Sequence, residues 1–285
     1  MITYKTVNVQ GIPIFYREAG PKDAPALLLL HGFPTSSHMF RNLIPLLADR
    51  FRVVAPDYPG FGNSGQPTVD QFPYTFDAIA AVMEGFLDAV GFETFFIYVQ
   101  DYGAPVGFRL ALQNAGRIKG IISQNGNAYE EGLSSAWDPI RKYWQEKSRE
   151  NGNALLGLLE KNFTKRQYIE GCRCPEAISP DTWNMDQYFL EREGNAEIQL
   201  SLFYDYRTNL EMYPRLHKYF RTLQPPALIV WGKNDIFFTV DGAMAYSRDL
   251  EKCEIHLLNT GHFALEEDLQ LYAVLIKRFL DMNAS

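Results

Sequence analysis

The feature that most limits the fold is a regular alternation between short, mainly apolar segments and longer segments with helical spacing. The apolar segments occupy residues 25–32, 51–57, 94–99 and 118–125. Segments that are apolar at consecutive positions are typical of strands buried on both faces. Between two of them, residues 75–91 place their apolar side chains along one face of a helix. The alternation therefore predicts an α/β fold, with helices on both faces of a mostly parallel sheet.

The two ends of the chain complete this sheet. Residues 5–20 form two alternating segments around Gly11, which predicts an antiparallel hairpin. Residues 225–235 and 253–258 have the composition of two further strands, and a helical segment closes the chain. With the four internal strands, the expected sheet has eight strands.

A helical insertion is expected between residues 127 and 222, because this part contains helix starts and no strand pattern. Two of the starts place a capping residue directly before a proline, at Asp138 and Ser179. The segment is rich in tyrosine and tryptophan, which suits a lid over an apolar pocket and equally the core of a small helical subdomain. We expect a core domain of residues 1–126 and 223–285, and a helical cap domain of residues 127–222.

Composition narrows the range of partners. A net charge of −7 and an isoelectric point near 5.3 argue against nucleic acid and anionic membranes. The first twenty residues lack the apolar core of a signal peptide, and three cysteines cannot all pair, so we expect a cytoplasmic protein. The pair Cys172 and Cys174 has no second Cys/His pair nearby, which disfavours a metal site. The oligomeric state stays open, with a homodimer as one option.

One candidate catalytic residue stands at the end of a predicted strand, in the sequence VQDYG. The loops that follow parallel strands meet at one edge of the sheet, where ligands bind. Asp101 would project from a tight strand-to-helix turn, with Gly103 giving clearance and Pro105 beginning the helix. Val99 departs from the small residue that is usual two positions before such a nucleophile. The alternative role for Asp101 is that of a helix N-cap.

Two later loops supply partners for this carboxylate. Asp235 follows the seventh predicted strand in KNDIFF, and His262 follows the eighth in TGHF. The chain order nucleophile, acid, histidine is the order of α/β-hydrolase triads. Each residue alone is more often structural, but three at three equivalent strand ends indicate a catalytic triad of Asp101, Asp235 and His262.

The loop HGFP after the third strand is expected to complete the site. The backbone amides of Phe33 and Tyr102 would form an oxyanion hole. His31 in the same loop is interpreted as a brace for the loop. His38, His217 and His256 have no such context and are interpreted as structural or surface residues.

Four stretches carry a resemblance to a known family: HGFPTSSHMFRNLIPLLADRFRVVAPDYPGFGNSGQP, VQDYGAPVG, LIVWGKNDIFF and NTGHF. They resemble the α/β-hydrolase superfamily and, within it, the epoxide hydrolase and haloalkane dehalogenase branch, over about residues 25–268. The resemblance implies an α/β-hydrolase fold with a helical cap inserted after the sixth strand. It also implies that no metal or organic cofactor is needed.

An aspartate nucleophile indicates displacement at a saturated carbon through a covalent ester with the enzyme. No G-x-S-x-G occurs, since Ser64 in GNSGQ lacks the following helix. Haloalkane dehalogenases typically bind halide with a Trp after the nucleophile and an Asn in HGNP, and this chain has Tyr102 and Phe33 there. Fluoroacetate dehalogenases carry arginines after the nucleophile, where this chain has Tyr102 and Pro105.

Epoxide hydrolases instead activate the leaving oxygen with cap tyrosines. FYDYRTN resembles the segment that supplies one of them, at Tyr206, and KYWQE resembles the second region with Tyr143 displaced by about one turn. Tyr129 is the alternative for the second tyrosine. The sequence therefore predicts an epoxide hydrolase for a small hydrophobic molecule, with a haloalkane dehalogenase as the alternative. A non-catalytic ligand receptor is a third reading, which the complete triad disfavours.

Overall fold

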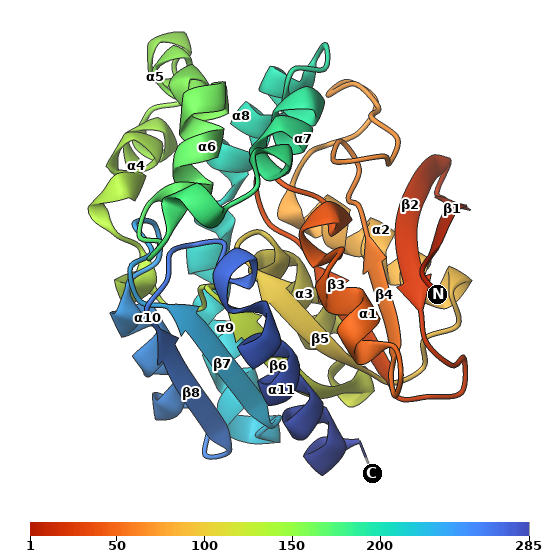
Figure 1. The fold of residues 1–285 in the computed structure, drawn as a ribbon. Coiled ribbons are helices and arrows are strands. Elements are labelled where there is room, and N and C mark those ends of the chain that lie inside the picture. Colours follow the sequence, from red (N-terminus) through yellow and green to blue (C-terminus); the bar gives the residue numbers. More distant parts are fainter. Residues whose placement is uncertain (285) are drawn as a thin grey trace.

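An eight-stranded sheet runs through the computed structural model, which describes residues 1–284 (Figure 1). The strands lie in the order β1-β2-β4-β3-β5-β6-β7-β8. Their bounds are β1 Thr3–Val9, β2 Ile12–Ala19, β3 Ala26–Leu30, β4 Arg52–Pro56, β5 Phe95–Gln100, β6 Ile118–Gln124, β7 Ala227–Gly232 and β8 Cys253–Leu258. Only the β1–β2 and β2–β4 pairs are antiparallel, so the predicted hairpin and mostly parallel sheet are confirmed.

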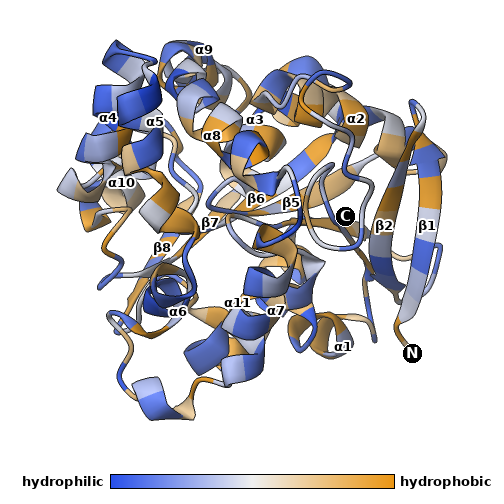
Figure 2. Cartoon of the chain, turned by 90° about the horizontal axis from the view of Figure 1, so that it is seen from above, coloured by the Kyte–Doolittle hydropathy of each residue, from blue (hydrophilic) through white to orange (hydrophobic). Residues whose placement is uncertain are grey.

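Helices cover both faces of this sheet. Their bounds are α1 Leu43–Leu47, α2 Phe76–Ala89, α3 Gly103–Gln113, α4 Asp138–Gln145, α5 Arg149–Ala154, α6 Lys161–Ile169, α7 Pro180–Leu190, α8 Asn195–Asp205, α9 Arg207–Leu223, α10 Val240–Ala245 and α11 Leu265–Asn283. In β3, Leu28 and Leu30 belong to the core under α2 and α3, whereas Leu27 and Leu29 face α1 and α11. Burial of consecutive residues on opposite faces explains why these strands read as unbroken apolar runs. Figure 2 shows this hydrophobic colour running along the strands between the two helical layers.

The segment between β3 and β4 contains two short helical elements. It forms a 3-10 turn at Ser37–Phe40 and then the short helix α1. Ser36 caps the turn by accepting a hydrogen bond from the amide of His38. The helical spacing of apolar residues in this segment does not reveal such a cap.

The insertion between β6 and β7 is helical from α4 to α9; α4 to α8 lie above the sheet, whereas α9 runs alongside it and packs against α3 (Figure 1). Helix α7 begins at Pro180 with Ser179 as its N-cap, as predicted. Asp138 is instead the first residue of α4, whose N-cap position is taken by Trp137. The boundaries of the cap at residues 127 and 222 remain a prediction, and α9 continues to Leu223 into the core layer. None of the helices between residues 1 and 284 combines the length and apolar character of a membrane span.

Candidate functional site

Asp101 occupies a strained turn between β5 and α3. Its φ of 49° lies in the left-handed region, which is unfavourable for an L-residue without a structural reason. Two glycines make room for the turn. A Cβ on Gly103 would lie 2.1 Å from the carbonyl oxygen of Leu30, and one on Gly32 would lie 2.4 Å from the Cβ of Asp101. Asp101 does not cap α3, since Tyr102 holds the N-cap position and makes no side-chain cap bond, so the alternative role is absent.

The two oxygens of the Asp101 carboxylate have different surroundings. Oδ1 accepts hydrogen bonds from the backbone amides of Phe33 at 2.8 Å and Tyr102 at 2.5 Å. Oδ2 lies 3.9 Å from Nε2 of His262. The predicted oxyanion-hole amides therefore already contact one oxygen of the predicted nucleophile, while the other faces the histidine.

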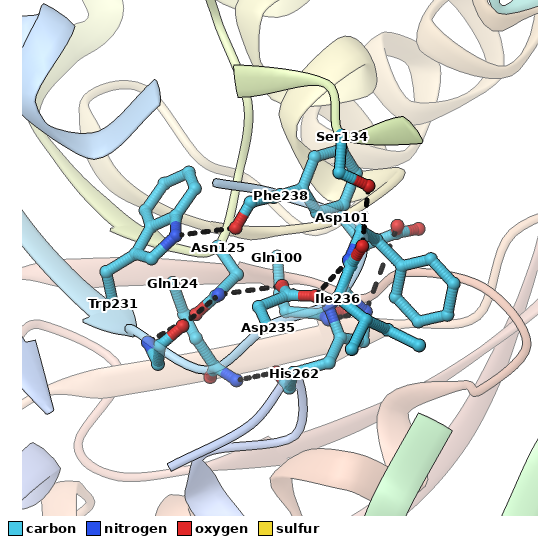
Figure 3. A network of polar contacts seen from close by, with 12 residues as sticks. Gln100, Asp101, Gln124, Asn125, Ser134, Trp231, Asp235, Ile236, Phe238 and His262 are labelled. Carbon is cyan, nitrogen blue, oxygen red and sulfur yellow. Dashed lines mark hydrogen bonds and ion pairs between the residues drawn. The ribbon is translucent and has the colours of Figure 1, made fainter. Parts of the chain in front are cut away.

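His262 lies between two carboxylates, in the network of Figure 3. Its Nδ1 donates to Oδ2 of Asp235 at 2.7 Å. Asp235 also accepts from Nδ2 of Asn125 at 2.7 Å and from the amide of Phe237 at 2.8 Å. The structure thus brings together the three residues of the predicted triad, on the loops after β5, β7 and β8.

Asn125 was not found by sequence reasoning. It directly follows β6, has a positive φ of 44°, and its Oδ1 accepts from the amide of Gly232 at the end of β7. These contacts hold its amide group against Asp235. The one signal in the sequence that could have identified Asn125 is its position directly after a strand, in SQNGN.

Gln100 is the second residue that sequence reasoning missed. Its side-chain nitrogen lies 2.8 Å from Nε2 of His262 (Figure 3). Because Nδ1 of the ring carries the proton and donates a hydrogen bond to Asp235, Nε2 is the acceptor in the contact with Gln100. The base nitrogen of the histidine is therefore hydrogen-bonded by the residue that precedes Asp101.

Burial and charge shift both titrating groups of the site. Burial raises the pKa of Asp101 to about 6, against the opposing effect of His262 and the two backbone amides. Burial acts to lower the pKa of His262, but the neighbouring Asp235 and Asp101 carboxylates outweigh it and raise that pKa. Each group therefore retains its proton to a higher pH than it would in water.

The remaining histidines lie outside this network. His31 accepts a hydrogen bond from the amide of Tyr58 at 3.3 Å and contacts the carbonyl of Gly32, so it braces the loop as expected. Burial lowers the pKa of His31 to about 3, which keeps the ring neutral. Within residues 1–284, no three His, Cys, Asp or Glu side chains gather in a way that could hold a metal ion.

A cavity of about 40 Å³ opens on Asp101 under the cap. It is lined by Phe33, Asp101, Tyr102, Ala136, Trp137, Ile140, Leu158, Phe163, Gln167, Phe203 and Phe237. The space holds about three waters, and its wall is mostly apolar. A ligand that fits without movement of the cap is therefore small and mainly nonpolar.

The two predicted cap tyrosines are not among the residues that line this cavity. Tyr206 is fully buried with a hydroxyl that has no hydrogen-bond partner, and the Trp137 ring packs on it at 4.3 Å between centroids. Tyr143 packs against Tyr204 instead. Trp137 occupies the wall of the cavity in front of Tyr206. Tyr129, the alternative, donates to Asp249 on the far side of the core.

Comparisons with known proteins agree with this architecture. Residues 25–269 match the family model described as alpha/beta hydrolase fold. An uncharacterised hydrolase of Saccharomyces cerevisiae is 44% identical over 268 residues, which cover 92% of each chain. Haloalkane dehalogenase 2 of Mycobacterium tuberculosis is 28% identical over 272 residues, covering 90% of this chain and 88% of the relative. The structure of the epoxide hydrolase CorEH has a TM-score of 0.80 at 20% identity, with 99% of both chains covered.

The family match covers strands β3 to β8, the cap and all three loops that carry the triad. The relatives and the structural neighbour include both dehalogenases and an epoxide hydrolase. The chain therefore belongs to the α/β-hydrolase family.

Proposed function

We propose that the protein hydrolyses small electrophiles at a saturated carbon through an ester formed on Asp101. The observation that carries the proposal is the unequal surroundings of its two carboxylate oxygens. Oδ1 accepts hydrogen bonds from the amides of Phe33 and Tyr102, whereas Oδ2 has no such donor and lies 3.9 Å from Nε2 of His262. In this scheme Oδ2 attacks the carbon, the bond to the leaving atom breaks, and the leaving atom departs with the electron pair.

The second step uses His262 as a general base. Nε2 takes a proton from water, and the resulting hydroxide attacks Cγ of the Asp101 ester. Negative charge then develops on Oδ1, which already lies 2.8 Å from the amide of Phe33 and 2.5 Å from that of Tyr102. When the intermediate collapses, the product alcohol leaves with Oδ2 and accepts the proton from His262. Asp235 stabilises the imidazolium that exists between these events.

The first candidate substrate class is a small epoxide. Its leaving oxygen remains on the product and needs a proton, which a phenol near the site can supply. Tyr206 is the proposed donor, because its hydroxyl is buried without a partner and its ring lies 6.1 Å from that of Tyr102. Donation requires the Trp137 indole to move aside. A role of Tyr143 stays a prediction, since its ring packs on Tyr204.

The second candidate is a small haloalkane. The haloalkane dehalogenase relatives favour it, as does an unpartnered side-chain amide in the wall of the cavity, that of Gln167. A halide needs hydrogen-bond donors but no proton. The variant Tyr206→Phe separates the candidates, because it should slow epoxide opening by about 10²-fold and leave halide displacement unchanged.

Single turnover in ¹⁸O-labelled water, followed by peptide mass spectrometry, tests the mechanism. The label should enter the carboxylate of Asp101, while the alcohol formed in the first turnover keeps the oxygen of the enzyme. The variant His262→Gln should accumulate an alkyl adduct on the same peptide. If a substrate is turned over with no label and no adduct at Asp101, the ester mechanism is wrong.

A further inference from the structure

Gln167 on α6 is a buried polar side chain that the mechanism above does not use. Only 3% of the residue is exposed, and its Nε2 has no hydrogen-bond partner. It lines the cavity that also contains Asp101. Burying an amide without a partner destabilises a fold, so such a group in a native site indicates a partner that arrives with the ligand.

A second glutamine of the cap shows that α6 and its neighbours can satisfy an amide. Gln187 on α7 is 6% exposed and accepts from the hydroxyl of Thr164 at 2.8 Å. Its nitrogen donates to the carbonyl of Leu159 at 3.1 Å. Gln187 does not line the cavity, whereas Gln167, on the preceding helix α6, does. The amide without a hydrogen-bond partner is therefore the one that lines the cavity.

The remaining cap residues around the cavity offer no competing donor. They are apolar except for Trp137, and its indole nitrogen donates to the carbonyl of Phe237 at 3.2 Å. On the core side, the two amides nearest the nucleophile are bonded to Oδ1 of Asp101. An atom that leaves the substrate carbon opposite Asp101 departs towards the cap, and the amide of Gln167 is the unpaired polar group that the cap contributes to the wall. The other unpaired polar group in the wall is the hydroxyl of Tyr102, which directly follows the nucleophile on the core side.

We propose that Gln167 donates a hydrogen bond from Nε2 to the leaving atom, halide or alkoxide oxygen, as negative charge develops on it. The inference rests on the ester mechanism proposed above, but not on the choice between the two leaving groups. An amide gives up no proton here, so an alkoxide still takes its proton from a phenol or water. Gln167 would then be a specificity-determining residue contributed by the cap.

The test is the rate of adduct formation on Asp101 in the His262→Gln background, with and without Gln167→Met. Methionine keeps the length of the side chain and removes the donor. We expect alkylation to slow by about 10²-fold with a chloroalkane and by much less with the matching iodoalkane, because the poorer leaving group needs the donor more. A small epoxide is tested in parallel. If Gln167→Met slows alkylation with the epoxide alone, the atom that Gln167 binds is the alkoxide oxygen.

Stability and a second variant separate chemistry from packing. Gln167→Met should leave the melting temperature unchanged or raise it, since the amide it removes has no partner. Gln167→Glu, which has the same shape, should slow alkylation further because a carboxylate opposes the developing charge. The control Gln187→Met should lower the melting temperature and leave the alkylation rate unchanged.

Equal alkylation rates in Gln167→Met and its parent would overturn the proposal, as would an equal loss with chloride, iodide and epoxide. Absence of any adduct in the His262→Gln parent would overturn the proposed function and this inference with it. An adduct in the parent that forms equally fast in the Gln167 variants would overturn the inference alone.

Discussion

The polar groups proposed to hydrolyse the ester and those near the path of the leaving atom differ in their hydrogen bonding. In the core, Oδ1 of Asp101 accepts from two backbone amides. Asp235 and His262 are hydrogen-bonded to each other and to further amide groups. All these distances lie between 2.5 and 2.8 Å. Near the leaving atom, the Tyr206 hydroxyl and the Gln167 amide of the cap are buried without partners, and so is the hydroxyl of Tyr102 on the core side. Groups that stabilise charge in the reaction are already held in place by hydrogen bonds before the substrate binds. Unpaired groups, in contrast, are free to form a hydrogen bond with an atom of the substrate. In the proposed mechanism, the first set of groups hydrolyses the ester and the second set, mostly from the cap, recognises the leaving atom.

The largest expected effect is on the core side. Asp101→Asn should reduce turnover by about 10⁴-fold or more and abolish the adduct, because the amide is a poor nucleophile. Steady-state rates and peptide mass spectrometry measure both. Asp57→Asn is the matched control, since Asp57 is also a buried carboxylate that accepts from two amides, those of Ser37 and Asn63. That control should lower the melting temperature and still form the adduct, so a loss of the adduct in both variants would contradict the assignment.

A smaller effect is expected at the support of the triad acid. Asn125→Gly keeps the positive φ but removes the donor to Asp235. Losing a hydrogen bond to a charged group should slow ester hydrolysis by about 10- to 100-fold. Ester formation should be unchanged, because in the proposed mechanism that step uses neither Asp235 nor His262 as a base. Rapid-quench measurement of the two steps checks this, and equal slowing of both steps would show that Asn125 acts only through the fold.

The same nucleophile is expected to destabilise the protein at neutral pH. Its pKa is raised to about 6 in the fold, against about 3.9 in an unfolded chain. The native state therefore binds more protons between these values, and its stability falls as pH rises through them. Above pH 6 the penalty is on the order of 3 kcal/mol. Asp101→Asn should increase the free energy of unfolding at pH 8 and much less at pH 3.5, and urea titrations at both pH values measure the change. An equal gain at both pH values would exclude ionisation as the cause.

The two sides also differ in how well the sequence predicted them. The fold and the positions of Asp101, Asp235 and His262 followed from apolar runs and from the residues directly after them, because chain order places strand ends at one edge of a sheet. Contacts between side chains on different loops, such as those of Asn125 and Gln100, have no local pattern. In the cap, resemblance predicted Tyr206 and Tyr143 at the cavity, but helix packing sets which side chain reaches the wall, and there it is Trp137 and Gln167. The sequence carried no signal for the latter.

The smallest expected effect concerns Gln100, which contacts the base nitrogen of His262. An N–H donor on Nε2 favours the neutral ring, so its removal in Gln100→Met should raise the pKa of His262 further above its ordinary value. Ester hydrolysis needs the neutral ring, and its acid limb should therefore move to higher pH, while the rate at high pH changes little. Gln124→Met is the control, because Gln124 donates to the backbone carbonyl of His262 and not to its ring. An acid limb that stays in place in Gln100→Met, or moves equally in both variants, would mean that Gln100 positions the loop and does not tune the base.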